Sequence, residues 1–262
     1  MAESRNHLQI RIDAPVATVI LDRPERRNAL SRTLVQSLIE CLDDLHHEGQ
    51  VRSVILTGAG DAFCSGTDLY EMKESIESPQ AFKIWHEETQ AFLSLIEAML
   101  RFPKPIIGAI NGPVAGSGVA VMLATDFVVA SDKATLLLPE SRRGLSAGLT
   151  TPLLSFRVGT SVAAQLLMTG TAVNAQRSAS IGLFHEVVPE DFVWAKSFEM
   201  ANQCAAGARE SHQMAKQLLN ETIGETLMMQ LNIGAANMAA ARTTEAAKEG
   251  VNAFLEKREP KW

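Results

Sequence analysis

The sequence predicts an α/β fold followed by a helical C-terminal part. Strand and helix patterns alternate over roughly the first half of the chain, and helical, Ala- and Met-rich stretches fill much of the region between Trp194 and Leu255. Alternation of this kind is typical of an α/β core. The sequence contains no internal repeat, low-complexity tract or flexible linker. We therefore expect one continuous α/β core with helices added at its C-terminal end.

The N-terminal segment predicts two strands and a helix. Residues 8–12 alternate apolar and polar side chains, and residues 16–21 form a short β-rich apolar run. The polar residues 22–27 then interrupt the pattern. Either Asn28 or Ser31 is suited to cap a helix, whose apolar side chains recur every four residues at Leu30, Leu34, Leu38 and Leu42.

The remaining elements follow in the same way. Residues 51–57 are a buried strand pattern, and residues 69–100 have apolar side chains at roughly helical spacing. A Pro-Lys-Pro sequence at 103–105 precedes the strand pattern 106–110. Beyond it we expect a helix at 119–124, strands at 128–130 and 135–138, and mainly helices from Thr150 onwards.

The composition excludes several classes of protein. There are 24 Lys and Arg against 30 Asp and Glu, a formal charge of −6, which argues against a nucleic-acid partner. The three cysteines are far apart and predict neither a disulfide framework nor a metal site, as in a reducing compartment. The first residues do not form a signal-peptide pattern, and no apolar run approaches the ~20 residues that span a bilayer. We expect a cytoplasmic protein without a membrane partner.

Two glycine-containing loops nearly match nucleotide-binding and hydrolase motifs. After Gly58-Ala59-Gly60, the third glycine of a dinucleotide fingerprint would fall on Phe63. After Gly116-Ser117-Gly118, it would fall on Val121. Ser117 also lacks the outer glycines of a nucleophile elbow. Neither loop therefore predicts a dinucleotide site or a serine hydrolase.

Four ordered motifs together resemble the enoyl-CoA hydratase/isomerase (crotonase) superfamily. They are LDRPERRNAL at residues 21–30, GAGDAFCSGTDL at 58–69, KPIIGAINGPVAGSG at 104–118 and PESRRGL at 139–145. The resemblance runs from near the N-terminus to about Pro189 and weakens in the helical tail. It implies a spiral of ββα turns over residues 1–195, which holds an acyl-CoA site. It also implies a helical region over residues 196–262 that takes part in oligomerisation, as a homotrimer or hexamer.

The resemblance also implies a site that stabilises the enolate of a thioester. Its carbonyl oxygen would lie between the backbone N–H groups of Thr67 and Ser117. Such preorganised donors are worth ~2.7–4 kcal/mol each, because they meet charge as it develops. The substrate and its CoA portion would be bound by Arg26, Arg27, Ala29, Ser65, Gly66, Asp68 and Gly116.

The acidic residues predict the reaction. The family's hydratases use two glutamates; here one position is Glu140 and the other is Ala120. A single carboxylate suffices to move a proton from C2 to C4, so the resemblance favours a Δ3 to Δ2 enoyl-CoA isomerase. Gly148 stands where dienoyl-CoA isomerases carry a further acid. No cofactor is expected, because CoA enters as the substrate's thioester carrier.

Other functions stay open at this point. Glu140 is also placed to form a surface ion pair with Arg142 or Arg143. Hydration, decarboxylation or C–C cleavage would use the same oxyanion site. A more distant alternative is a catalytically inactive acyl-CoA-binding or scaffold subunit. The acyl pocket is expected to use the segment 69–100, with Met72, Phe82 and Trp85 as apolar candidates.

Overall fold

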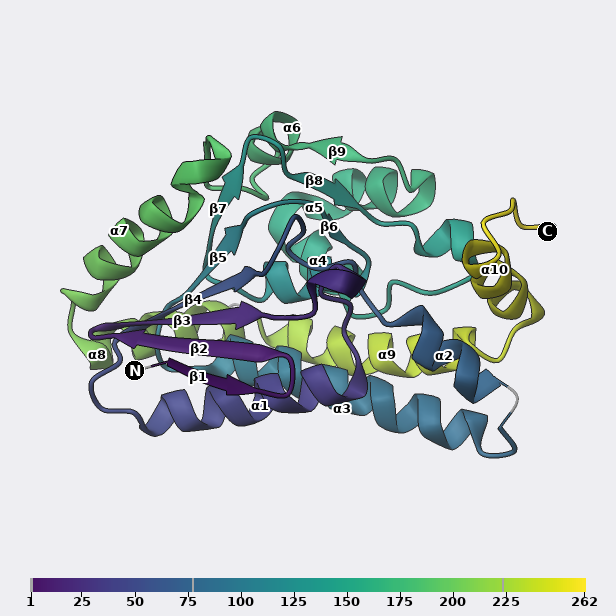
Figure 1. The fold of residues 1–262 in the computed structure, drawn as a ribbon, viewed down its shortest axis with the longest axis horizontal. Coiled ribbons are helices and arrows are strands. Elements are labelled where there is room, and N and C mark those ends of the chain that lie inside the picture. Colours follow the sequence, from purple (N-terminus) through teal and green to yellow (C-terminus); the bar gives the residue numbers. More distant parts are fainter. Residues whose placement is uncertain (1, 77, 223) are drawn as a thin grey trace.

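A computed structural model describes residues 2–76, 78–222 and 224–262. Its main sheet has the strand order β1-β2-β3-β4-β5-β7-β10 (Figure 1). The first three strands are antiparallel, and β3, β4, β5, β7 and β10 run parallel. The strands are β1 (Ala2–Arg5), β2 (Leu8–Asp13), β3 (Val16–Leu21), β4 (Ser53–Gly58), β5 (Ile106–Ile110), β7 (Phe127–Ser131) and β10 (Glu186–Val188).

A second, smaller sheet has the order β6-β8-β9. Its strands are β6 (Val114–Ala115), β8 (Thr135–Leu137) and β9 (Val173–Asn174). The helices are α1 (Arg32–His47), α2 (Leu69–Ile76), α3 (Ala81–Arg101), α4 (Ser117–Leu123), α5 (Thr150–Thr169), α6 (Ala175–Ser180), α7 (Val193–Ala205), α8 (Arg209–Gln217), α9 (Glu225–Ala241) and α10 (Glu245–Leu255). The predicted α/β class is confirmed.

The two faces of the main sheet bury different sets of side chains. Because successive side chains in a strand point to opposite faces, Val54 and Leu56 enter the large core while Ile55 faces away from it. Helix α7 covers the second face, where Val193 and Ala201 join the same cluster as Ile55. In Figure 1 this helix lies at the left of the sheet.

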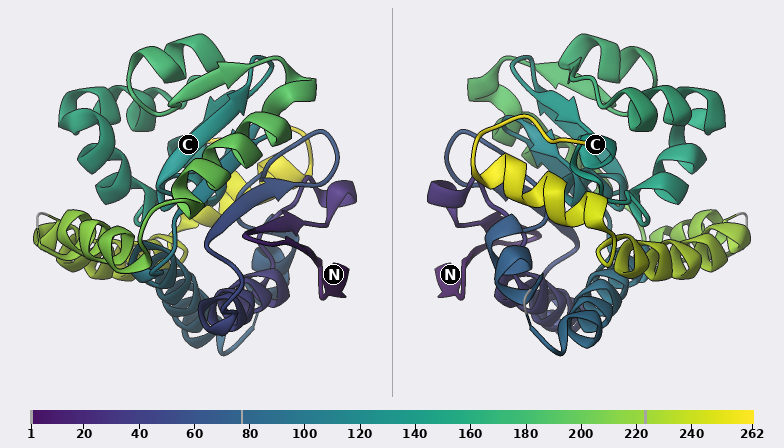
Figure 2. Two further views of the ribbon diagram at one scale, coloured as in Figure 1. Left: turned by 90° about the vertical axis from the view of Figure 1, so that its left-hand side faces the viewer. Right: turned by 90° about the vertical axis from the view of Figure 1, so that its right-hand side faces the viewer.

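Helices α1, α3 and α9 pack together below the sheet (Figure 1). Helix α1 begins as its pattern predicts, since the hydroxyl of Ser31 accepts a hydrogen bond from the N–H of Leu34. Its leucine stripe is buried in the main core. Helix α9 supplies further side chains to that core, namely Leu227, Leu231, Ala235 and Met238. Figure 2 shows α10 crossing one end of the molecule, where it packs against α2.

Two helical expectations differ in detail from the structure. The segment 69–100 is two helices, with α2 ending at Ile76 and α3 beginning at Ala81. Pro79 lies between them, and a proline there cannot donate the backbone hydrogen bond that one continuous helix would need. Helix α4 begins at Ser117, two residues before the predicted start. Among the described helices, none combines the length and apolar character needed to cross a bilayer.

Candidate active site

Two loops meet at the carboxyl edge of the main sheet. The chain leaves β4 at Gly58 and β5 at Ile110, and these neighbouring strands are parallel. Their following loops therefore leave from the same edge. An isolated bridge joins Cys64 to Val114, and the N–H of Ala115 donates to the carbonyl of Cys64 at 2.9 Å. The fold thus holds the segment before Thr67 alongside the segment before Ser117.

The backbone N–H groups of Thr67 and Ser117 are free to bind a ligand. Among the described residues neither N–H donates a hydrogen bond, since Ser117 is the first residue of α4 and Thr67 lies in a loop. Their side-chain hydroxyls are hydrogen-bonded to each other at 2.9 Å. Both residues also line the same cavity. Two N–H groups without a protein acceptor at one cavity are the kind of donor that an oxyanion site uses, and this role stays a prediction.

Gly66 allows these two loops to approach each other. Its φ of +92° lies in a region that side-chain-bearing residues rarely adopt. A Cβ at this position would lie 2.8 Å from the carbonyl oxygen of Ala115 and 3.1 Å from the nitrogen of Ser117. Both the conformation and the space therefore require glycine.

Glu140 reaches the same place from the smaller sheet. Strand β8 runs parallel to β6, with Leu137 paired to Ala115, and the N–H of Gly116 donates to the carbonyl of Leu137. Three residues later, Glu140 begins a short 3₁₀ helix that ends at Arg143. A Cβ on Gly116 would lie 3.6 Å from Glu140 Oε1. The register of β6 and β8 thus places a carboxylate beside the Ser117 loop.

Burial changes the acidity of Glu140. Its Oε2 is inaccessible and has no hydrogen-bond partner among the described residues. Loss of hydration raises the pKa of Glu140 to about 7, against the smaller opposing effects of a backbone hydrogen bond and the charge of Arg143. A carboxyl group with this pKa can both accept and return a proton near neutral pH.

The surface ion pair considered for Glu140 does not form in the described part of the chain. Arg142 instead donates to the carbonyl of Thr169, and the guanidinium of Arg143 lies 4.0 Å from the ring centre of Phe254. Glu140 is therefore a half-buried acid that lines the cavity and whose Oε2 is enclosed.

The cavity has two branches that meet at Thr67 and Ser117. The small branch, about 40 Å³, contains Glu140 and is also lined by Leu69, Met72, Arg143, Leu145 and Ser146. The large branch, about 390 Å³, extends between α1, α2, α3 and the end of α9. Four residues line both branches: Thr67, Ser117, Met238 and Arg242. A ligand bound by the two N–H groups can therefore reach Glu140 on one side and a larger space on the other.

Comparison with known proteins assigns the chain to a family. The model of the enoyl-CoA hydratase/isomerase family matches residues 11–262. The chain belongs to this family. It is 30% identical to the short-chain-enoyl-CoA hydratase of Clostridium acetobutylicum, over 97% of this chain and 96% of that protein. It is 29% identical to the 1,2-epoxyphenylacetyl-CoA isomerase of Escherichia coli, over 96% of both chains.

A solved structure agrees with this assignment. The enoyl-CoA hydratase/isomerase from Pseudoalteromonas atlantica has a TM-score of 0.84 and is 30% identical, covering 98% of this chain and 99% of that one. The predicted superfamily and the crotonase-type fold are thus confirmed. Membership of this family supports an enzyme that processes acyl-CoA substrates.

Of the residues predicted to bind CoA in this enoyl-CoA hydratase/isomerase family chain, Asp68 lines the large branch, and Ser65 and Gly116 line the small branch. Arg26 and Arg27 are exposed, and the carbonyl of Arg26 accepts a hydrogen bond from the Ser65 hydroxyl at 3.1 Å. The guanidinium of Arg26 also lies 4.3 Å from the ring centre of Tyr70. Ala29 is buried.

Asp68 has internal partners in the same region. Its carboxylate forms an ion pair with Arg23 at 3.0 Å and accepts a hydrogen bond from the N–H of Tyr70, at the start of α2. Arg23 in turn donates to the carbonyl of Ala29 at 2.7 Å. These contacts fix the loop around Ala29 against the loop around Thr67. The role of the predicted set in holding CoA stays a prediction.

The position of the missing second glutamate lies inside the core. Ala120 is fully buried in α4 and belongs to the main hydrophobic cluster. Of the three apolar residues expected in the acyl pocket, Met72 lines the small branch. Phe82 is exposed and stacks on His86, while Trp85 is buried and donates from Nε1 to the Ser75 hydroxyl at 2.7 Å.

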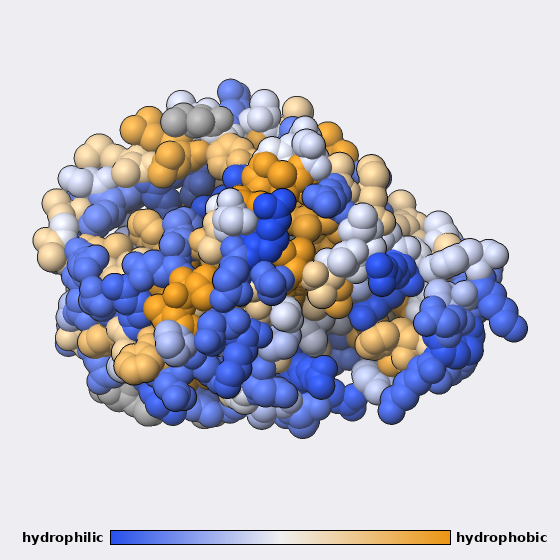
Figure 3. All heavy atoms as spheres, turned by 90° about the horizontal axis from the view of Figure 1, so that it is seen from above, coloured by the Kyte–Doolittle hydropathy of each residue, from blue (hydrophilic) through white to orange (hydrophobic). Residues whose placement is uncertain are grey.

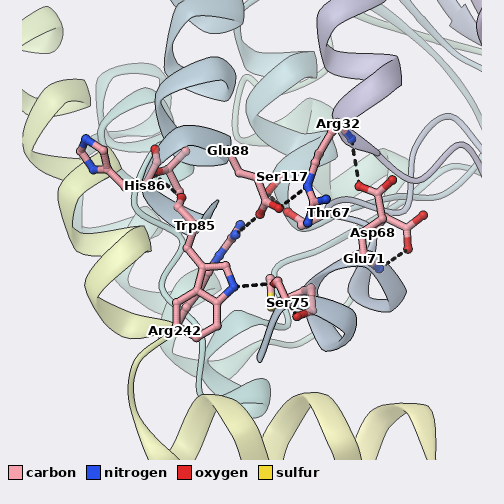
Figure 4. Close-up of polar contacts among 12 residues, drawn as sticks. Arg32, Thr67, Asp68, Glu71, Ser75, Trp85, His86, Glu88, Ser117 and Arg242 are labelled. Carbon is pink, nitrogen blue, oxygen red and sulfur yellow. Dashed lines mark hydrogen bonds and ion pairs between the residues drawn. The ribbon is translucent and has the colours of Figure 1, made fainter. Parts of the chain in front are cut away.

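Sequence reasoning missed a group of charged residues in the large branch. Glu88 of α3 forms ion pairs with Arg32 of α1 and with Arg242 at the end of α9, as Figure 4 shows. Arg32 and Arg242 lie 56 and 154 positions from Glu88 in the sequence, so no local motif joins the three residues. The sequence feature that could have indicated this group is Arg242 itself, a cation that directly follows the Ala- and Met-rich apolar stretch of α9.

Proposed function

We propose that the protein shifts the double bond of an enoyl-CoA from C3 to C2, with Glu140 as the single proton carrier. One observation carries the proposal. In the described part of the chain, Glu140 is the one acidic residue that lines the small branch, beside the N–H groups of Thr67 and Ser117. Its pKa of about 7 suits a group that must take and give a proton in one turnover.

The reaction follows from this arrangement in two proton transfers. The Glu140 carboxylate takes a proton from C2 of a 3-enoyl thioester, and the electrons of that C–H bond move into a dienolate. Negative charge gathers on the thioester oxygen, where the N–H groups of Thr67 and Ser117 stabilise it. The protonated Glu140 then returns the proton to C4, which leaves the double bond between C2 and C3.

Hydration is the alternative that the residues favour less. Addition of water across a double bond benefits from a second carboxylate, and general acid–base help is worth ~10²–10⁴-fold. Ala120 has no ionisable group, and Glu88 in the large branch is held by two arginines. The relatives include both a hydratase and an isomerase, so the choice between them rests on these residues.

The test is a paired assay on one purified sample. We expect isomerisation of 3-enoyl-CoA substrates to exceed hydration of 2-enoyl-CoA substrates of the same chain length. Hydration that equals or exceeds isomerisation across several chain lengths would contradict the single-carboxylate mechanism. The proposal also includes turnover without an added cofactor and a cytoplasmic location.

A further inference from the structure

A buried cation lies where the two branches of the cavity meet. Arg242 follows the last residue of α9, and its side chain is 5% exposed. It lines both branches, together with Thr67 and Ser117. A thioester carbonyl bound by those two residues therefore lies in a space that Arg242 also lines.

Arg242 has more hydrogen-bond donors than protein partners. A guanidinium carries five N–H groups. Within the described residues, its side chain makes one hydrogen bond, from Nη1 to Glu88 Oε2. Burial lowers the pKa of Arg242, which is a sign that the charge is poorly hydrated. In the described part of the chain, no Arg242 nitrogen is a fully enclosed atom without a partner, so the remaining N–H groups open on the cavity and can donate to an oxygen of a ligand.

The charges around Arg242 restrict the kind of oxygen. The large branch is lined by two arginines, Arg32 and Arg242, and by four acidic residues, Asp68, Glu71, Glu87 and Glu88. Asp68 and Glu87 are paired with cations outside this lining, so the charges next to Arg242 decide. There a carboxylate on the acyl chain would face Glu88, and an amine would face Arg242. A hydroxyl group can accept from Arg242 and donate to Glu88 at the same time.

We propose that Arg242, supported by Glu88, selects acyl-CoA substrates that carry a hydroxyl group on the chain beyond C4. This inference rests on the proposed function, because it needs the thioester carbonyl at Thr67 and Ser117. The large branch has room for such a chain, while the small branch admits only the atoms next to the thioester. Arg242 is then a specificity-determining residue that acts on the acyl group and leaves the proton transfer to Glu140.

The experiment compares matched thioesters and matched variants. The substrates are 3-hexenoyl-CoA and its 5-hydroxy and 6-hydroxy derivatives. The variants are Arg242→Met, which keeps length and removes the donors, and Arg242→Lys, which keeps a charge and a donor. Arg101→Met serves as the control, because Arg101 is an exposed residue of α3 that pairs with Glu97 outside the cavity. Melting curves of all variants accompany the kinetics.

We expect the wild type to prefer at least one hydroxylated substrate by about tenfold or more in kcat/KM, as a hydrogen bond to a charged group allows. Arg242→Met should lower kcat/KM for the preferred hydroxylated substrate by a much larger factor than for 3-hexenoyl-CoA, and Arg242→Lys should restore part of that difference. An equal loss on all substrates would overturn the inference, since it would make Arg242 a purely structural tie between α9 and α3. Should Arg242→Met fail to fold, the wild-type comparison decides alone, and a preference below twofold overturns the inference.

Failure of the proposed function gives a different result. If the wild type isomerises none of the three substrates, the isomerase proposal fails. Titration with the saturated hexanoyl-CoA and 6-hydroxyhexanoyl-CoA then still tests Arg242, because binding does not need the chemical step. Tighter binding of the hydroxylated thioester that Arg242→Met abolishes supports the inference, and equal affinities contradict it.

Discussion

Glu140 meets two opposing demands at the level of a single residue. It must lose its proton to act as a base, yet its Oε2 lies where water does not reach. Desolvation raises its pKa to about 7, so the basic and the protonated forms are both present near neutral pH. We therefore expect kcat/KM for isomerisation to rise with pH through this value, provided that Glu140 is the base.

Glu140→Gln tests the chemical role directly. The amide keeps the size of the side chain and removes the basic carboxylate, so we expect turnover to fall by at least ~10²-fold. Affinity for a saturated acyl-CoA should change little, because the Thr67 and Ser117 donors stay in place. The measurements are kcat with a substrate that the wild type accepts and a binding titration. Turnover near the wild-type rate would remove Glu140 from the mechanism.

The raised pKa of Glu140 also makes the stability of the folded wild type depend on pH. The pKa of Glu140 is about 7 in the folded chain against an ordinary value of 4.5, so the folded state binds more protons than the unfolded state between these values. Stability of the wild type is therefore lost as pH rises from 4.5 through 7. The loss is on the order of 3 kcal/mol by the relation between pKa shift and free energy.

Because glutamine carries no charge, Glu140→Gln should be more stable than the wild type at pH 8 and nearly equal to it at pH 4.5. Thermal or urea unfolding of both proteins at the two pH values checks this expectation. A difference that does not vary with pH would show that Glu140 ionises freely in the folded protein.

At the level of elements, the oxyanion site depends on a close approach between the two loops. Gly66→Ala would place a methyl group 2.8 Å from the Ala115 carbonyl at a positive φ. We expect the loop to shift, with a loss of about 10²-fold in kcat/KM if one donor is misplaced. The matched control is Gly49→Ala, where a Cβ meets nothing within 4 Å. Equal activity of the two variants would contradict the assigned geometry.

The sequence predicts these elements well where local patterns determine them. The leucine repeat and Ser31 predict α1, and apolar runs predict β4 and β5 to within two residues at their ends. The N–H donors of Thr67 and Ser117 and the base Glu140 are predicted from family motifs at fixed spacing, because a periodic pattern cannot identify an N–H group without an acceptor. The Arg32, Glu88 and Arg242 cluster was missed because it joins three distant helix positions, and only tertiary packing decides whether an arginine is buried.

At the level of the whole molecule, the predicted trimer or hexamer stays a prediction. Several large apolar side chains of the helical region 196–262 are exposed, among them Met214, Met229, Ile233 and Phe254. On the face shown in Figure 3, apolar residues form separate patches among hydrophilic ones. Such patches favour self-association without fixing its symmetry.

Sedimentation at micromolar concentration checks the oligomer, and we expect a species of three or six chain masses. A monomer as the sole species would contradict this expectation.

The predicted division at residue 195 separates a core from a helical region. In the structure, α9 contributes side chains to the same core cluster as α1 and α3. Truncation before α9 would therefore expose part of that core.

The contacts between the Arg23–Ala29 loop and the Ser65–Asp68 loop have a consequence for how substrate binding is used. The N–H of Leu30 donates to the carbonyl of Gly66, the N–H of Asp68 donates to the carbonyl of Leu30, and Arg23 pairs with Asp68. If the nucleotide end of CoA contacts Arg26 or Arg27, it holds the same unit that carries the Thr67 donor. Binding of the nucleotide end, which does not react, then lowers the mobility of the Thr67 donor beside the reacting carbonyl. A thioester that lacks the nucleotide portion of CoA would therefore react more slowly as well as bind more weakly, because the residues that contact the nucleotide and the oxyanion donor lie in two loops that are bonded to each other.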